Sequence, residues 1–341
     1  AVAKPGEPKH FALELAVAAN GSELQFYVSV PDSKRDLFEK QLLAVFPLAQ
    51  LQVRENDYNV FQDGGSVALA TMRLAHNAAL PLKDYTDFDY DPLNAILNAF
   101  SKIEGSGEGA ALQIIVEPRG SRHTAHYQKM LSAARKGASR SAVLSTPETA
   151  LGEFALGLGT FFVQKEKDAQ KKREKEMRNI EENKNLVEEI QKKIAAPIVG
   201  VTIRLAVSSQ SAARAEQVVS ELEAAFNQFN STEGNHITFL HESKKLSSRT
   251  LENFSFRLPD RAALALSLRE LTSLYHFPPQ GIESSPHLNQ SRAAHASAPL
   301  TLPRSGALLG TNSYRGAHTP IYLETEDRLR HLYVVGQTGT G

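Results

Sequence analysis

The stretch FALELAVAANGSELQFYVSV, residues 11–30, decides the fold class of this chain. Apolar side chains alternate with other residues in both of its halves, at Phe11, Leu13, Leu15, Val17, Leu24, Phe26, Val28 and Val30. Asn20 and Gly21 stand between the halves, and Asn-Gly favours the tight turn of a β-hairpin. The pattern therefore predicts two adjacent antiparallel strands, each with one face to bury.

The residues after this hairpin alternate between helix and strand patterns. Helices are predicted at 31–46, at 123–134 and after Asp91-Pro92, where Asp is a capping residue and Pro suits the first helical turn. Strands are predicted at 51–54, 67–74 and 111–117. Together these elements predict an α+β domain over residues 1–144.

Residues 145–197 are predicted to form a helical connector. The run from 165 to 193 is dense in both charge signs and has only a sparse apolar stripe, which is typical of a long solvated helix. It sustains too few heptads for a coiled coil. The most apolar window, 150–163, is too short to span a bilayer and is predicted to be a buried helix.

A second α+β domain is predicted at 198–277. The predicted elements are a strand from Val201, a helix at 210–229, a strand at 236–242, a strand through Phe254, Phe256 and Leu258, and a helix that Asp260 caps. This β-α-β-β-α order belongs to ferredoxin-like folds, and residues 1–144 follow a looser variant of it. The predicted fold class is thus α+β, with two ferredoxin-like-type domains joined by a charged helical segment.

A Pro-, Ser- and Ala-rich linker is predicted at 278–304, and a hairpin and an apolar strand follow it. The chain then reads GQTGTG: Gly336, Gln337, Thr338, Gly339, Thr340 and Gly341. These are six of the eight positions of the phosphate-binding loop G-x-x-x-x-G-K-[ST], whose backbone amides surround phosphate. From these residues alone, either a nucleotide loop cut short before its lysine or a Gly- and Thr-rich tail is possible.

The composition limits the other classes of function. Thirty-eight basic and 38 acidic residues give zero net charge, so the whole molecule has no general attraction for nucleic acid or anionic membrane. The absence of cysteine excludes disulfides and thiolate metal sites. No metal site is predicted: His123 and His126 lack a third ligand, and the aspartates from Asp84 to Asp91 have the spacing of turn and helix-cap residues.

One local stretch is strongly basic. Residues 118–147 contain no Asp or Glu but six cations: Arg119, Arg122, Lys129, Arg135, Lys136 and Arg140. Such a stretch could follow a nucleic-acid backbone or contact a charged partner. A solvated helix face is the simpler interpretation, because no aromatic residues interleave with the cations as in RNA-binding modules.

The end of the chain resembles a known family. RLRHLYVVGQTGTG (328–341), preceded by LLGTNSYRGAHTPIYLE (308–324), resembles the entry to the motor domain of the HerA/FtsK superfamily, in particular the ATPases of type IV secretion and conjugative DNA transfer. Four upstream stretches resemble the N-terminal region of a bacterial branch of these proteins: ELQFYVSVP, DYNVF, DYDPLNAILNAFSKI and LRELTSLYHFPP. The resemblance covers most of the chain.

The resemblance implies a P-loop ATPase domain that starts at 305–341, with Gly336 to Gly341 as the nucleotide loop. Its full-length form would bind ATP and Mg²⁺, move DNA or protein, and assemble as a homo-hexamer with the secretion or conjugation machinery at the cytoplasmic face of the inner membrane. The N-terminal domains would serve assembly and docking. Because the sequence stops before the loop's lysine, this chain itself is expected to bind no cofactor and to hydrolyse no ATP. The alternative is a self-contained protein- or nucleic-acid-binding module without nucleotide chemistry.

Overall fold

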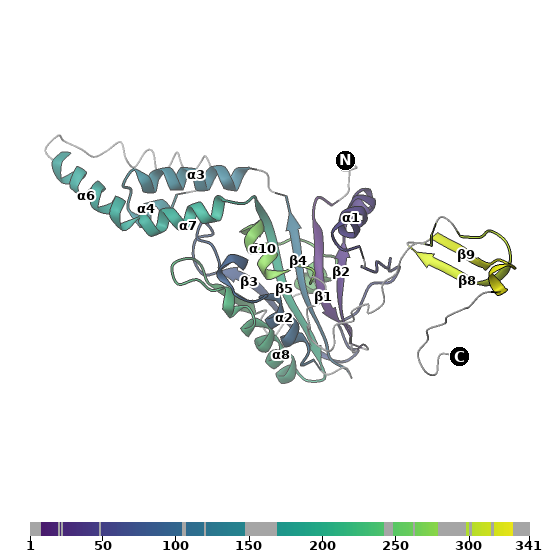
Figure 1. Ribbon diagram of the computed structural model, residues 1–341. Helices are drawn as coiled ribbons and strands as arrows, with labels where there is room; N and C mark the ends of the chain where they lie inside the picture. The colour runs from purple at the N-terminus through teal and green to yellow at the C-terminus, as the bar shows by residue number, and fades with distance from the viewer. Residues whose placement is uncertain are drawn as a thin grey trace. The chain divides into compact units, whose positions relative to one another are not determined.

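The computed structural model describes residues 8–19, 21, 23–47, 49–103, 107–118, 121–146, 169–241, 248–261, 263–278, 298–299, 302–314 and 317–329. The chain divides into two compact units. The first comprises Ala1–Gln41 and Val53–Asn289, and the second Leu42–Gln52 and Gln290–Gly341. A seven-stranded sheet organises the first unit, and a two-stranded sheet lies in the second (Figure 1).

The large sheet is antiparallel throughout. Its strands are β1 (Phe11–Val17), β2 (Leu24–Ser29), β3 (Ser66–Leu74), β4 (Gly109–Glu117), β5 (Ile198–Ser209), β6 (Ile237–His241) and β7 (Leu264–Ser267). They run in the order β2-β1-β4-β5-β3-β6, while β7 pairs with the first residues of β5. The predicted hairpin is confirmed as β1 and β2, which pair from Ala12↔Ser29 to Val17↔Leu24.

The two predicted α+β domains share this one sheet. Strand β4, which precedes the connector, pairs with β5, which follows it, from Gly109↔Ser208 to Glu117↔Gly200. Strand β3 likewise pairs with both β5 and β6. The α+β class is confirmed, but the prediction of two separate domains is wrong, because the central strands are buried on both faces and complete a core only together.

Some helices of the first unit pack on the sheet and others form an arm. They are α2 (Leu93–Phe100), α3 (Arg122–Arg135), α4 (Arg140–Leu144), α6 (Ala169–Glu182), α7 (Lys184–Ile194), α8 (Ala212–Ala224), α9 (Ser248–Ser255) and α10 (Leu268–Leu274). Helix α1 (Asp32–Val45) spans the boundary between the units and has no buried residue. The predicted helices at 31–46 and 123–134 correspond to α1 and α3.

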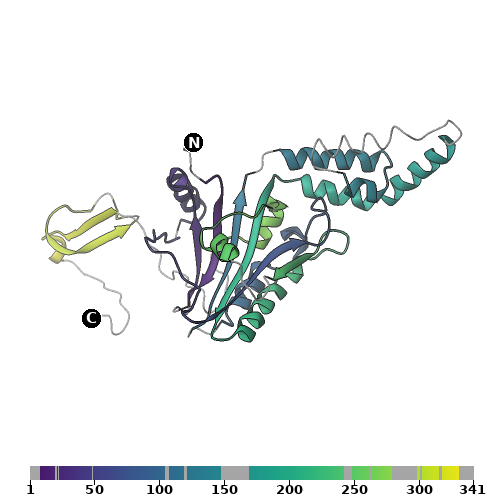
Figure 2. The same ribbon diagram turned by 180° about the vertical axis from the view of Figure 1, so that it is seen from behind.

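The main core lies between the sheet and helices α2, α8 and α10. Alternate strand residues point into it, among them Leu15, Leu112, Ile114, Ile203 and Leu205. They meet Leu97 of α2 and Leu222 of α8. The opposite face of the sheet carries small residues, Ala16, Ala111 and Ala206, and α9 packs on it through Phe254 (Figure 2). The sheet therefore has one strongly apolar face and one face with room for polar side chains.

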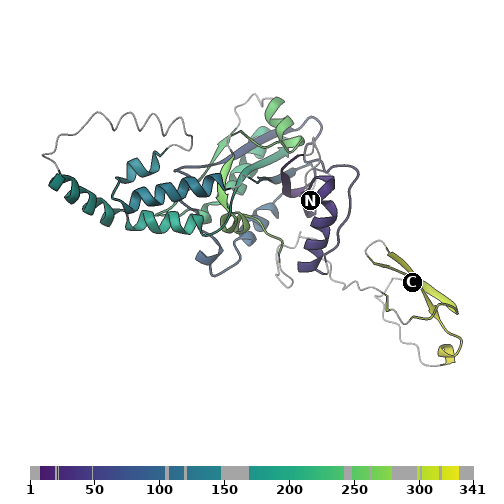
Figure 3. The same ribbon diagram turned by 90° about the horizontal axis from the view of Figure 1, so that it is seen from above.

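Four helices form an arm between two neighbouring strands. The chain leaves the sheet at the end of β4, forms α3 and α4, continues through 147–168, and returns along α6 and α7 to the start of β5. Helix α3 packs against α7 through Tyr127, Met130, Leu186 and Ile190 (Figure 3). The connector is thus helical, as predicted, where the structure describes it.

Three predicted elements differ from the structure. Residues 51–54 form no strand, and all four are exposed. The alternation through Phe254, Phe256 and Leu258 is the end of α9 and the turn after it, and only Phe254 is buried. The helix predicted from Asp260 begins later, because β7 comes first and Ser267 caps α10. The apolar side chains of β7 bury against β5, and this tertiary pairing outweighs the helical spacing.

The second unit contains the predicted C-terminal hairpin. Strands β8 (Ala307–Tyr314) and β9 (Ala317–Leu323) pair antiparallel with a bulge between Leu308 and Gly310, and a short helix, η4 (Asp327–Leu329), follows. Most of the predicted linker, and the predicted buried helix at 150–163, lie outside the described residues. Within the ranges described, none of the helices combines the length and apolar character that crossing a membrane requires.

Candidate functional site

The predicted nucleotide loop lies beyond the last described residue. Gly336, Gln337, Thr338, Gly339, Thr340 and Gly341 are all outside the described residues, as is the apolar strand before them. The structure ends with η4, seven residues before Gly336. The described elements nearest the loop in sequence are therefore η4 and, before it, the hairpin β8–β9.

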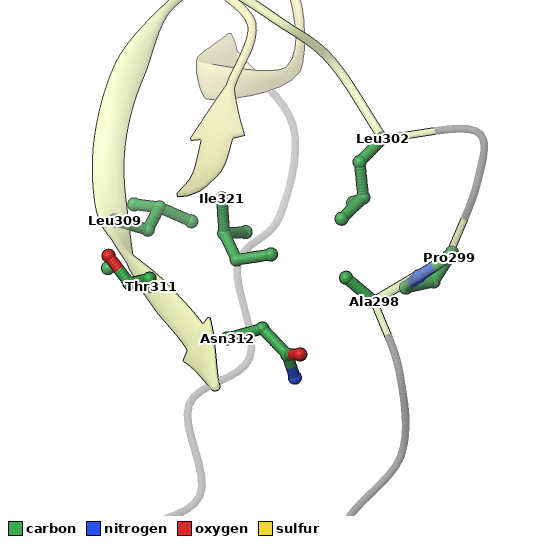
Figure 4. A pocket seen from close by; sticks show the side chains of 8 residues that line it. Ala298, Pro299, Leu302, Leu309, Thr311, Asn312 and Ile321 are labelled. Atoms are coloured by element: carbon green, nitrogen blue, oxygen red, sulfur yellow. The ribbon is translucent and has the colours of Figure 1, made fainter. Parts of the chain in front are cut away.

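A shallow apolar hollow lies beside this hairpin (Figure 4). Its volume is about 600 Å³, and it is lined by Ala298, Pro299, Leu302, Leu309, Gly310, Thr311, Asn312 and Ile321. No charged side chain is in this lining. A triphosphate needs cations or a nest of backbone amides, so this hollow is not suited to bind one.

The hairpin exposes large apolar side chains. None of its residues with a described side chain is buried. Leu308 is 61% exposed and pairs across the strands with Tyr322, which places both on one face. Leu329, at the end of η4, is 89% exposed. An isolated two-stranded hairpin is marginally stable in water. This hairpin therefore presents a surface that suits a further strand or layer.

The predicted basic residues come together on the arm. Arg122, Lys129 and Arg135 belong to α3, Lys136 is its C-cap, and Arg140 begins α4; all five are exposed. Arg119 is outside the described residues. Arg122, Lys129 and Lys136 are seven residues apart, so they follow one side of the helix at steps of about 10 Å. The structure thus supports the interpretation of a solvated helix face and leaves that face accessible.

The turn between α3 and α4 is held firmly on α6. Gly137 has φ of +80°, and a Cβ built on it would lie 2.6 Å from the backbone oxygen of Glu176. Asn179 donates a hydrogen bond to the Gly137 oxygen, and the buried Asn183 donates to the oxygens of Ala138 and Ala134. Two helix-borne amides therefore satisfy the carbonyls of this turn, and glycine allows its close approach.

The base of the arm is joined to helix α10 by a buried ion pair. The Nζ atom of Lys193, in α7, lies 2.8 Å from Oε2 of Glu270, in α10, and both side chains are buried. Glu270 also accepts hydrogen bonds from the backbone amides of Leu82 and Ser267. Burial lowers the pKa of Lys193, and the charge of Glu270 opposes this shift. Every carboxylate oxygen is thus paired, as a buried charge requires.

A second, more exposed pair lies beside the first. Lys192 donates to both carboxylate oxygens of Asp87, at 2.9 and 2.7 Å. Burial alone would raise the pKa of Asp87, but hydrogen bonds from Lys192 and from the Asp84 backbone amide lower it below its usual value. Together the two pairs fix the last turn of α7 against the body of the unit.

Three of the four aspartates of the segment KDYTDFDYDP have the predicted turn or capping roles. Asp84 accepts from the amide of Thr86, and Asp87 accepts from the amide of Asp84, which forms a capping box around the short helix η1 (Tyr85–Asp87). Asp91 accepts from the amide of Leu93 at the start of α2. These bonds account for their spacing without a metal ion.

A polar row across the sheet was not predicted. Glu14 of β1, Gln113 of β4 and Arg204 of β5 are cross-strand neighbours on the face opposite the main core. Gln113 donates to Glu14 at 2.7 Å and accepts from Arg204 at 3.0 Å, and all three side chains are buried. Each polar residue stands in the middle of an apolar strand sequence: FALELAV, ALQIIVE and VTIRLAV. That shared position was a signal for the row.

The row continues into ion pairs at both ends. Arg257, after α9, donates to Glu14 and to Asp57, and its guanidinium lies 5.8 Å from the ring centroid of Tyr58. At the other end, Arg204 pairs with Asp260. Burial opposes the charge of Arg257, but hydrogen bonds to Asp57 and the charge of Glu14 outweigh it and raise the pKa of this guanidinium. The network joins α9 to three strands. Both carboxylate oxygens of Glu14 accept hydrogen bonds within it, so this carboxylate is not available to a ligand.

Comparison with known proteins connects this architecture to one family. A family model with the description "Domain of unknown function (DUF8128)" matches residues 6–290. Searches of curated proteins and of solved structures found no significant match. The matched range includes the whole seven-stranded sheet and the arm, and it ends before the hairpin β8–β9. Since the match covers well over half of the sequence, this chain belongs to the DUF8128 family.

Proposed function

We propose that this chain is the N-terminal assembly region and the start of the motor domain of an ATP-dependent translocase of a conjugation or type IV secretion system. Residues 305–341 would be the first part of a P-loop ATPase domain. Residues 8–278, with their sheet and arm, would dock onto neighbouring subunits or onto the machinery at the inner membrane. The substrate moved would be DNA or protein.

One observation carries this proposal. An antiparallel hairpin and the short helix η4, both with exposed apolar side chains, precede the sequence HLYVVGQTGTG. Leu308 and Leu329 would be covered if the apolar strand 331–335 and further strands of a P-loop domain packed against them. A Gly- and Thr-rich tail would leave these leucines in water. The resemblance of residues 308–341 to motor-domain entries supports the same assignment.

The proposed chemistry of the loop follows from its backbone. Gly336, Gly339 and Gly341 would let successive amides turn toward a phosphate group, and a helix that starts after them would add its positive dipole end. ATP and Mg²⁺ would bind only where a lysine and a hydroxyl residue follow Gly341.

The gene sequence beyond the codon of Gly341 tests the proposal first. Lysine followed by serine or threonine supports a nucleotide loop, and any other continuation removes the ATPase and leaves a binding module. The extended protein should then bind a fluorescent ATP analogue with Mg²⁺ and hydrolyse ATP. Gly341→Val should abolish both activities, because its side chain would fill the phosphate cradle. Gln217→Ala, in helix α8 and outside residues 305–341, is the matched control and should change neither.

A further inference from the structure

The charges of this neutral chain are unevenly distributed. Residues 122–144 and 169–194, which form the arm, contain thirteen basic and six acidic residues, a difference of +7. The whole chain contains 38 of each, so the remainder has 25 basic and 32 acidic residues, a difference of −7. The described helices of the arm therefore carry an excess of positive charge, although the net charge of the whole chain is zero.

The positive charge of the arm is concentrated at the α3–α4 turn. Arg135, Lys136 and Arg140, here called the cationic turn, are exposed within six residues of one another. None of the three side chains makes a hydrogen bond or ion pair within the described parts of the chain. A helix C-terminus stabilises cations, which accounts for Arg135 and Lys136. Arg140 begins α4, where the helix dipole disfavours a cation, so local structure does not account for it.

The cationic turn is rigid enough to serve as a contact. Gly137 at its centre lies against the backbone of Glu176, and the amides of Asn179 and Asn183 bind its carbonyls. A preorganised group of cations loses less conformational entropy on binding than cations on a mobile loop. This rigidity favours recognition of a particular acidic surface.

An acidic patch lies at the base of the same arm. Burial raises the pKa of the Glu189 carboxyl, and nearby carboxylates raise it further while Lys192 lowers it. Glu188 and Glu189 precede Lys192 in α7, and Lys192 pairs with Asp87. These three carboxylates and that of Glu233, whose charge acts on Glu189, are here called the acidic patch. Glu188 and Glu233 are exposed and, within the described ranges, have no ion-pair partner. Lys192 and, more weakly, Lys83 offset only part of this charge.

The two surfaces are held apart within one molecule. The cationic turn is bound to α6 and α7 at Asn183, whereas the acidic patch surrounds Lys192, nine residues later in α7. Glu188 lies five residues after Asn183, and the stretch from Asn183 to Lys192 spans about 14 Å. The charged side chains of both surfaces are exposed, at Arg135, Lys136, Arg140, Glu188 and Glu233. Each surface is therefore accessible to another molecule.

We propose that the cationic turn of one copy docks on the acidic patch of a second copy of this chain. Such a contact joins two different surfaces, so it is heterologous and leads to a ring or an open row of subunits. The proposal extends the assembly role proposed above. It uses no residue of the nucleotide loop, so loss of ATP hydrolysis and loss of this contact can be told apart.

Complementary charge reversal tests the contact. The chain should self-associate in sedimentation velocity at about 50 mM salt and dissociate at about 300 mM salt. Lys136→Glu with Arg140→Glu should weaken the association by roughly tenfold or more, and Glu188→Lys with Glu233→Lys should do the same. An equimolar mixture of these two double variants should associate again, because every positive surface then has a negative partner. Lys102→Glu and Glu55→Lys, at exposed positions elsewhere, are the matched controls and should have little effect.

Several results would overturn the proposal. These are a wild-type chain that stays monomeric at low salt, double variants that associate normally, and a mixture that does not recover while circular dichroism shows both variants folded. DNA duplexes and vesicles with anionic lipid are included as competitors. If Lys136→Glu with Arg140→Glu weakens binding to either one and leaves self-association unchanged, the cationic turn recognises that polyanion and not a second copy.

Discussion

Arg257 donates two hydrogen bonds to the fully buried carboxylate of Glu14, at 3.0 and 2.8 Å, from a backbone in the left-handed region with φ of +53°. The amides of Arg257 and Leu258 bond to the oxygens of Phe254 and Asn253, which is the Schellman arrangement that ends α9. Glycine is the usual residue at this position. Arginine there costs about 1 kcal/mol of backbone strain, which its ion pairs offset.

Removal of this guanidinium should destabilise the fold strongly. Arg257→Ala leaves Glu14 buried without a cation, and we expect a loss of about 3–5 kcal/mol in the free energy of unfolding. Arg257→Gly also removes the guanidinium, but glycine adopts this backbone conformation without strain. It should therefore be about 1 kcal/mol more stable than Arg257→Ala. Urea unfolding measures both. Equal stability of the two variants would contradict the strain, and a loss below 1 kcal/mol would contradict the importance of the pair.

The close contact at the α3–α4 turn predicts a difference between two glycines. Gly137→Ala needs a left-handed alanine and places its Cβ against Glu176, so the expected loss is about 2–4 kcal/mol. Gly64→Ala is the matched control, because Gly64 has φ of +72° but no atom within 4 Å of a built Cβ. It should cost only about 1 kcal/mol. Thermal or urea unfolding of both variants checks the difference, and similar losses would show that α6 does not pack on the turn.

The buried pair at the base of the arm predicts a local effect. Lys193→Met leaves the carboxylate of Glu270 without its cation, and we expect a loss of about 3–5 kcal/mol. Lys192→Met removes the partly exposed pair with Asp87 and should cost about 1 kcal/mol or less. Hydrogen exchange should show that the backbone amides of α7 and α10 exchange faster in Lys193→Met than in the wild type. If Lys192→Met proves the more damaging variant, Lys193 is not the anchor of the arm.

Two tyrosines should report the pH dependence of folding. Burial, and next the charge of Glu14, raise the pKa of Tyr58 and of Tyr275 well above the usual value near 10. A raised folded pKa means that folding favours the neutral phenol. The resulting stabilisation is complete below about pH 10 and is lost as the pH rises through the folded pKa. Phenolate absorbance near 295 nm of the wild type, Tyr58→Phe and Tyr275→Phe should show both phenols protonated at pH 10 in the folded protein. Ordinary titration of either group would exclude its burial.

Local elements of this fold could be predicted from the sequence, but the pairing of the strands could not. Alternation from Phe11 to Val17 and a capping aspartate before Leu93 depend on near neighbours, so β1 and α2 could be predicted from the sequence. The partner of β4 lies beyond the connector, and no pattern within β4 indicates a partner at Ser208. For the same reason the sequence suggested two domains where one sheet exists.

The candidate sites divide in a similar way. The six basic residues were identified from composition, and the structure describes five of them on the arm. The acidic patch could not be predicted, because Asp87 and Glu233 are distant in sequence and meet Glu189 only in the folded unit. Arg257 lies in a segment that was predicted to be a strand, so its link to Glu14 depended on an element that the sequence pattern misassigned.

The insertion of the arm between β4 and β5 has a consequence for how the chain folds. Gly109 and Ser208 are cross-strand partners separated by about a hundred residues, so direct closure of that loop is entropically unfavourable and slow. The helices of the arm form from nearer contacts, and once α3 packs on α7 the ends of β4 and β5 are brought together. We expect the arm to behave as the nucleus that aligns the two central strands, so that substitutions in the α3–α7 contact slow refolding more than they speed unfolding.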